Sequence, residues 1–149
     1  MEYNGEGVAA LVSIIVELQT VNLILADKKV KELLKCLAFY PEFRSVLSHV
    51  NRGFDYQTEK RKALQKVGEH NVLRMPKNEK VFVALVANML VEMDKGDMDL
   101  LSFARNFFPA TTGQESLERF VSNVVEPFKF FIVNMVVNVK LDSISIRVR

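Results

Sequence analysis

Apolar residues recur at helical spacing along most of this chain. Residues 28–40 carry apolar side chains at i, i+3, i+4 and i+7, and residues 41–50 repeat the pattern (Val30, Leu33, Leu34 and Leu37; Phe43, Val46, Leu47 and Val50). Such spacing places one apolar stripe along a helix. Six glycines and four prolines in 149 residues leave few breaks between these segments. The sequence therefore predicts an all-α fold, an irregular bundle of about six or seven helices with a short β segment at the C-terminus.

The remaining helices are placed by the same criterion. The apolar pattern and its flanking cap residues predict helices over residues 8–26, 55–69, 81–95, 98–108 and 128–139. A further helix is expected to start within residues 109–120, with an apolar face that extends from Leu117 to Val125. Asp27 is expected to cap or kink the chain between the first helix and the next. Pro127 is expected to break or kink the helix that it interrupts, because it lacks a backbone donor and clashes with the preceding turn.

The C-terminal residues change period. Apolar and polar residues alternate from Val137 to Val148, with one shift of phase at Asp142–Ser143. Alternation of this kind is typical of a strand. We therefore expect residues 1–140 to form a single helical domain. Residues 141–149 are expected to be an extended tail, which could pair as a strand or begin a further domain.

The composition of the chain and the lack of a recognisable targeting signal favour a globular, cytoplasmic protein. The 49% hydrophobic and 26% charged shares are those of a folded domain. The N-terminus lacks the basic region of a secretory signal. The lone Cys36 excludes an internal disulfide and is interpreted as core filling.

Neither apolar segment of the chain fits a membrane span. Residues 8–26 carry Glu17, Gln19 and Asn22 near their centre, where charges and amides are costly in hydrocarbon. Residues 128–139 are too few for the roughly 20 that a spanning helix needs. We therefore expect no membrane contact.

Arg44 and His49, in the stretch RSVLSH, offer one candidate for catalysis. An Arg followed by four residues and a His resembles the short motif of HEPN-type ribonucleases, which are helical bundles that act as dimers. The resemblance covers six residues. It implies that Arg44 holds the phosphate oxygens of RNA while His49 exchanges a proton. A structural or surface role for His49 is the preferred interpretation.

Positive charge is concentrated between Arg44 and Lys80, where nine Lys and Arg accompany four Asp and Glu. Cationic side chains that follow a phosphate backbone would bind nucleic acid. The candidates for such a site are Arg52, Lys60, Arg61, Lys62, Lys66 and Arg74. Solvated helix faces are the preferred interpretation of this segment too.

An acidic cluster follows at Glu92, Asp94, Asp97 and Asp99. Carboxylates can bind a hard cation, but the spacing is not that of a calcium loop. A helix that stops at Gly96, followed by Asp97 as the cap of the next helix, explains these residues. The sequence also lacks a glycine-rich phosphate loop and paired metal-binding cysteines, so no metal or cofactor is expected.

The function expected from these patterns is a non-enzymatic helical interaction or self-association module. Three segments carry a surplus of apolar helix surface: residues 8–26, 81–93 and 128–139. A bundle of this size can enclose only one or two such helices completely. The excess would be covered across a subunit interface, so we expect a homodimer or another protein partner. The alternatives are the ribonuclease and the nucleic-acid-binding domain.

Overall fold

The computed structural model of the chain describes the backbone of residues 5–148 and the side chains of residues 5–138. Its helices and strands follow in the order α1 (Glu6–Thr20), α2 (Leu23–Phe39), α3 (Pro41–Val50), α4 (Tyr56–Ala63), β1 (Leu64–Val67), β2 (His70–Leu73), α5 (Glu79–Lys95), α6 (Leu100–Phe107), α7 (Gly113–Phe120), a π-helical turn (Val121–Val125) and α8 (Glu126–Val148).

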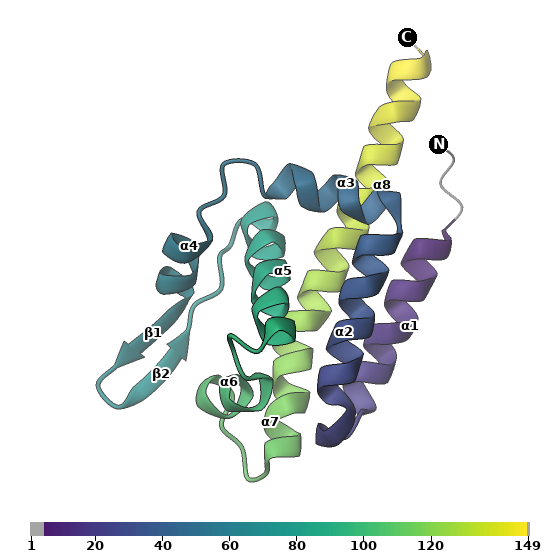
Figure 1. Cartoon of the computed structure of the whole chain (residues 1–149). Coiled ribbons are helices and arrows are strands. Elements are labelled where there is room, and N and C mark those ends of the chain that lie inside the picture. Colours follow the sequence, from purple (N-terminus) through teal and green to yellow (C-terminus); the bar gives the residue numbers. More distant parts are fainter. Residues whose placement is uncertain (1–4, 149) are drawn as a thin grey trace.

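The predicted all-α class is confirmed. Because α7, the π-helical turn and α8 form one continuous helix, the described residues contain seven helices and one small two-stranded sheet. Figure 1 shows α1, α2, α5 and α8 side by side along the length of the bundle, with α3 lying across one end and α6 at the other. The hairpin of β1 and β2 and the short α4 project from the side opposite α1.

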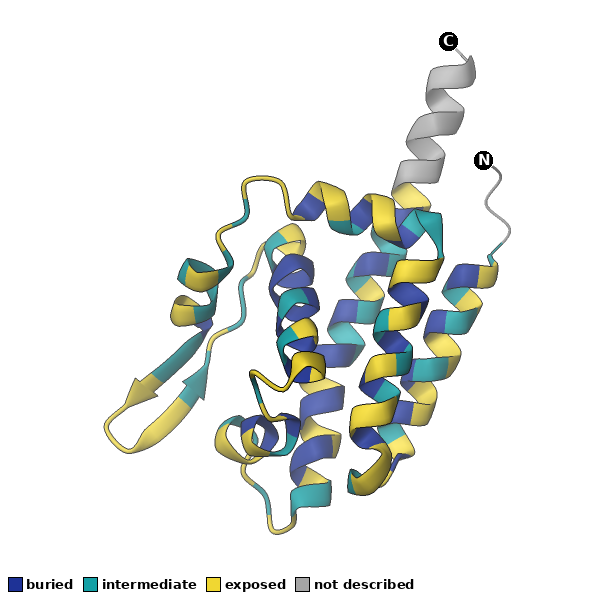
Figure 2. Cartoon of the chain, in the orientation of Figure 1, coloured by how far each residue is buried: buried dark blue, intermediate teal, exposed yellow. Residues whose placement is uncertain are grey.

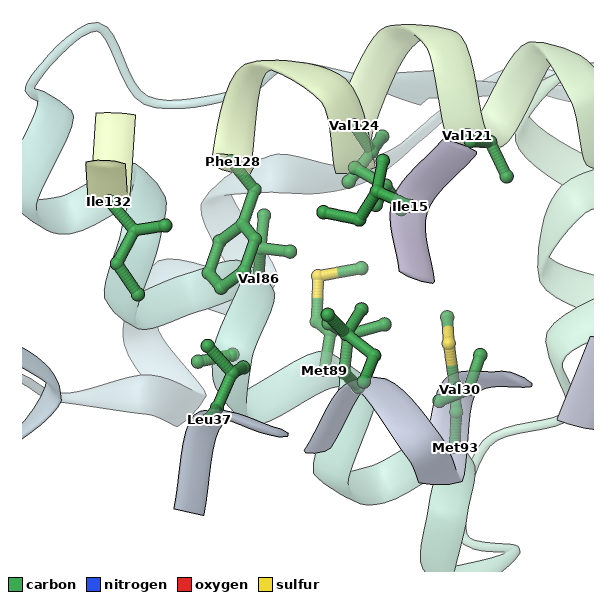
Figure 3. Packing of buried hydrophobic residues seen from close by; sticks show 14 of the residues in the cluster. Ile15, Val30, Leu37, Val86, Met89, Met93, Val121, Val124, Phe128 and Ile132 are labelled. Carbon is green, nitrogen blue, oxygen red and sulfur yellow. The ribbon is translucent and has the colours of Figure 1, made fainter. Parts of the chain in front are cut away.

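The core lies between α5, α2 and α8. Figure 3 shows Val86, Met89 and Met93 of α5 facing side chains of α2 (Val30 and Leu37) and of α8 (Phe128 and Ile132). Ile15 of α1 packs beside Val124 of the π-helical turn, which closes the core on its other side. Residues 82–87 of α5 are buried without interruption, so α5 is the most enclosed helix (Figure 2).

The predicted helix over residues 8–26 is wrong, because the chain breaks at Val21. Val21 is extended, and Asn22 caps α2: its side-chain oxygen accepts the N–H groups of Ile24 at 3.1 Å and Leu25 at 3.3 Å. The side chain of Gln114 clamps this link. It donates to the carbonyl of Val21 at 2.8 Å and accepts from the N–H of Leu23 at 3.1 Å. The cap is therefore Asn22, and Asp27 lies inside α2.

The predicted helix over residues 55–69 is only half helical. It ends at Ala63, and the rest forms an antiparallel hairpin in which Leu64 pairs with Leu73 and Val67 with His70. Gly68 turns the chain with φ of 64°, a left-handed conformation that glycine adopts without strain. We refer to α4, β1 and β2 together, residues 56–73, as the arm. In Figure 2 the arm is mostly exposed or intermediate.

The helix continues through Pro127, so the break that we named as one possible effect of this proline does not occur. The preceding turn is π-helical, and the N–H of Glu126 bonds to the carbonyl of Val121, five residues earlier. This wider turn resets the hydrogen-bond pattern, so that Pro127 falls in the first turn of α8, where its missing N–H is not needed.

The short β segment lies in the arm and not at the C-terminus. The structure continues α8 through Val148, whereas we predicted an extended tail from residue 141. The physical reason lies in the sequence itself: Val137, Leu141, Ile144 and Val148 also stand at helical spacing, so the same residues satisfy both periods. The side chains of residues 141–149 lie outside the described ones.

Candidate functional site: an uncharged face on α1 and α8

α1 and α8 run antiparallel and touch, and a polar contact fixes their relative height (Figure 1). The side-chain amide of Gln19, near the end of α1, donates to the carboxylate of Glu126 at the start of α8. Residues the same number of positions before Gln19 and after Glu126 therefore lie at similar heights along the pair of helices.

Both helices carry the same pattern of outward side chains. On α1 the pattern is Ala9, Val12, Ser13 and Val16; on α8 it is Phe130, Val133, Asn134 and Val137. In each helix the four positions are i, i+3, i+4 and i+7, with a small or neutral polar residue at i+4. All four α1 residues are exposed, as are Phe130 and Val137, while Val133 and Asn134 are half-buried. We call these eight residues the uncharged face.

Solvent reaches large apolar side chains on this face. Phe130 is 60% exposed and Val16 is 51% exposed. Isolated apolar residues are normal on a protein surface, whereas a contiguous group on two adjacent helices is typical of an interaction site. The predicted surplus of apolar helix surface thus lies on α1 and α8, since α5 is enclosed.

The segments of α1 and α8 that form the uncharged face contain very few ionisable residues. Residues 7–16 contain no Asp, Glu, Lys or Arg, and residues 121–138 contain only Glu126 and Lys129. These two pair with each other, the Lys129 ammonium lying 2.9 Å from the Glu126 carboxylate. An exposed helix of a soluble domain normally carries charges on its outer side, whereas α1 carries them only at Glu6 and Glu17, on either side of residues 7–16.

A second cluster, of ionisable side chains, fixes the arm to the bundle. The Lys60 ammonium on α4 lies 2.9 and 3.1 Å from the two carboxylate oxygens of Glu92 on α5. It also lies over the ring of Tyr56, 5.5 Å from its centroid. Burial, and then the adjacent Glu92 carboxylate, raise the pKa of the Tyr56 hydroxyl.

Glu92 itself stays ionised in this cluster. Burial alone raises the pKa of its carboxyl group, but the neighbouring Tyr56 hydroxyl and Lys60 ammonium outweigh that effect and hold the pKa below its usual value. The side chains of Lys60 and Glu92 are 25% and 17% exposed. The cluster is therefore a structural link between α4 and α5.

The candidate nucleic-acid-binding residues do not all share one surface. Lys60 is engaged by Glu92, Lys62 lies 3.5 Å from Glu59, and Arg61 donates to the hydroxyl of Thr58. Lys66 and Arg74 are exposed, but alternation along the hairpin places them on opposite faces of the ribbon. Arg52 lies beside His49 and lines a hollow that also includes Glu59 of the arm and Lys80.

Arg44 and His49 point to different sides of α3. Five residues apart on a helix, they are rotated by about 140° from each other. The Arg44 guanidinium donates to the carbonyls of Ala38 and Phe39, each at 2.8 Å, and so caps the end of α2. His49 is exposed and lines a hollow of about 460 Å³ together with Arg52, Lys80, Asp55 and Glu59. Within one copy these contacts keep the two residues apart.

The acidic cluster is divided among structural contacts. Besides Glu92, Asp94 lies 3.8 Å from Lys31, and Asp99 caps α6 by accepting the N–H of Ser102 at 2.8 Å. Asp99 and not Asp97 thus provides the helix cap, while Gly96 ends α5 as expected, with φ of 84°. Among the residues that the structure describes, no group of three or more His, Cys, Asp or Glu side chains is arranged to hold a metal ion.

Cys36 is buried in α2, as expected for core filling. Burial, and then the negative charge of Glu42, raise the pKa of its thiol to about 11. A thiol in this environment is a poor nucleophile.

One helix in the described part of the chain is long and apolar enough to cross a membrane, by length and composition only. It runs over Gly113–Asn138, 26 residues, and 39% of its most apolar window is buried inside the bundle. The argument that this segment is too short to span a bilayer therefore fails, because the helix does not end at Pro127. The core helix of a soluble protein passes the same test, so the feature indicates little by itself.

Sequence reasoning missed the pairing of α1 with α8. The repeated spacing of the four outward residues was present in both segments, but the Gln19–Glu126 contact joins residues 107 positions apart. Comparison of the chain with protein-family models, with curated proteins and with solved structures found no match.

Proposed function

We propose that the chain is a non-enzymatic helical interaction module that binds a protein partner through the uncharged face. The observation that carries the proposal is the group of exposed apolar side chains on two adjacent helices, in a region whose single pair of charges is internally neutralised. Such a surface gains free energy when water is excluded from it.

Phe130 gives the scale of that gain. A fully buried large apolar side chain contributes about 1.5–3 kcal/mol, so covering a ring that is 60% exposed contributes roughly 1–2 kcal/mol. Aromatic anchors of this kind often dominate the energetics of protein interfaces. The flanking valines extend the apolar surface along both helices.

The two alternatives have less support. Arg44 caps a helix and points away from His49, so one copy does not combine them at a single phosphate. Among the candidate basic side chains, Lys60 and Lys62 pair with Glu92 and Glu59, and Lys66 and Arg74 lie on opposite faces of the hairpin. A protein-binding function needs only the exposed apolar side chains of the uncharged face, without any rearrangement of the chain.

A photo-reactive phenylalanine analogue tests the proposal in cells. Incorporated in place of Phe130, it should form a covalent adduct with a protein. Phe39 offers a matched control, because it is 72% exposed but lies at the C-terminal end of α2, outside the uncharged face. Adducts at 130 that are absent at 39 support the proposal. Equal labelling at the two positions, or no protein adduct at 130, contradicts it.

A further inference from the structure

We infer that the partner of the uncharged face is a second copy of this chain, packed across a two-fold axis that crosses α1 and α8 at the middle of the uncharged face. This inference rests on the function proposed above and names its partner. It follows from the heights of the two residue patterns, from the distribution of charge and from the size of the face.

The two patterns are centred at the same height. The centre of the pattern on α1 lies between Val12 and Ser13, which is about 10 Å along the helix from Gln19. The centre on α8 lies between Val133 and Asn134, about 11 Å along the helix from Glu126. One axis through both centres therefore superimposes each pattern on its own antiparallel copy, with α1 against α1 and α8 against α8.

This arrangement brings complementary residues together. Ala9 of one copy lies opposite Val16 of the other, and Phe130 lies opposite Val137. The neutral polar residues Ser13 and Asn134 lie nearest the axis and face their own copies, and a hydroxyl or an amide can both donate and accept a hydrogen bond. Isolated buried amides of this type fix the register of paired helices.

The charge distribution fits a second copy better than a charged partner. Residues beside a two-fold axis meet themselves, so a charge there would face a like charge, and the uncharged face has none. The Glu126–Lys129 pair lies at one end of the face. A two-fold axis perpendicular to the helices places this ion pair opposite the other end of the partner's uncharged face, near Ala9 and Val137 of the second copy. The ion pair therefore does not face the same ion pair of the second copy.

A lipid surface fits the same face less well. Helices that lie in a membrane interface carry Lys and Arg along their flanks, where these side chains reach the anionic headgroups. Among the residues of α1 and α8 whose side chains the structure describes (6–20 and 126–138), Lys129 is the one Lys or Arg, and Glu126 already neutralises it. The buried side chains of α8, such as Phe128 and Ile132, are also held in the core.

The size of the face sets the expected affinity. Standard stable interfaces use roughly 20–30 residues on each side, and the uncharged face has eight. We therefore expect a reversible dimer with a dissociation constant in the micromolar range or weaker.

Sedimentation velocity over a range of protein concentrations tests the inference. The wild type should pass from monomer to dimer as concentration rises. Phe130→Glu should raise the dissociation constant at least 10-fold, while the matched Phe39→Glu should leave it unchanged. Val16→Glu and its control Val67→Glu, at side chains 51% and 56% exposed, provide an independent pair should one variant fold poorly.

The outcomes separate this inference from the proposed function. A monomer at every concentration, or a dimer that Phe130→Glu and Val16→Glu leave intact, overturns the second copy as the partner. The adducts formed at position 130 then decide the proposed function alone. Flotation with neutral phosphatidylcholine vesicles covers the lipid alternative: binding by a monomeric wild type that Phe130→Glu abolishes overturns both.

Discussion

The ion pair between Lys60 and Glu92 predicts how firmly the arm is held to the bundle. Replacing Glu92 with Gln keeps the shape of the side chain and removes its charge. Both partners are less than a third exposed, so solvent screens the pair less than a surface salt bridge. A hydrogen-bonded charge in such a setting contributes about 1.5–3 kcal/mol. Allowing for the amide bond that Gln retains, we expect a loss of about 1–2 kcal/mol at neutral pH.

The pH dependence of this loss identifies its cause. The folded-state pKa of Glu92 lies below its unfolded value of about 4.3. The pair therefore stabilises the fold fully above that value and loses its contribution as the pH falls through the folded-state pKa. The difference in unfolding free energy between the wild type and Glu92→Gln should shrink as the pH is lowered through this window.

Urea unfolding at pH 7 and in steps down to pH 3 measures this difference. Glu118→Gln, an exposed carboxylate on α7, is the matched control and should change the free energy of unfolding by less than about 0.5 kcal/mol. A double-mutant cycle with Lys60→Met should return most of the loss as coupling. A loss that is independent of pH, or an uncoupled pair, would refute the reasoning.

Two further predictions concern the bundle. Gln114→Ala removes both bonds that clamp the α1–α2 link and should lower the free energy of unfolding by about 1–3 kcal/mol, whereas Gln57→Ala, at an exposed position, should change it little. If the two variants lowered the free energy of unfolding equally, the clamp would contribute nothing to stability. The Cys36 thiol should react with a disulfide reagent at pH 8 at least about 100-fold more slowly in the folded protein than in urea; similar rates would contradict its burial.

Local signals were enough to predict the helices whose ends are marked by caps. Gly96 and Pro41 stand where the expected helices end and begin. Asn22 was overlooked because the apolar run continues past it, although its side chain caps α2. The hairpin was overlooked because Lys60 to Lys66 form a polar run without helical or strand periodicity. Gly68, in the left-handed conformation, was the one residue that could have indicated the turn.

Tertiary contacts determine the rest. The apolar segments of α1, α5 and α8 look alike in sequence, yet α5 is enclosed while α1 and α8 keep an exposed side. Their spacing shows that each has an apolar stripe, but it does not show which stripe a neighbour covers. Likewise, the π-helical turn before Pro127 allows a helix to continue where the proline alone predicts a break. The candidate face could therefore be recognised only once α1 and α8 were seen together.

Disulfide formation across the proposed two-fold axis tests the central claim most directly. Ser13 lies near the axis, so Ser13→Cys should form a disulfide-linked dimer under mild oxidation, in proportion to the reversible dimer already present. Ser48→Cys, at an exposed position on α3, is the control and should remain monomeric. The buried Cys36 should contribute no background. Rapid linkage of Ser13→Cys alone is the predicted result; equal linkage of both variants, or none at position 13, would contradict the account.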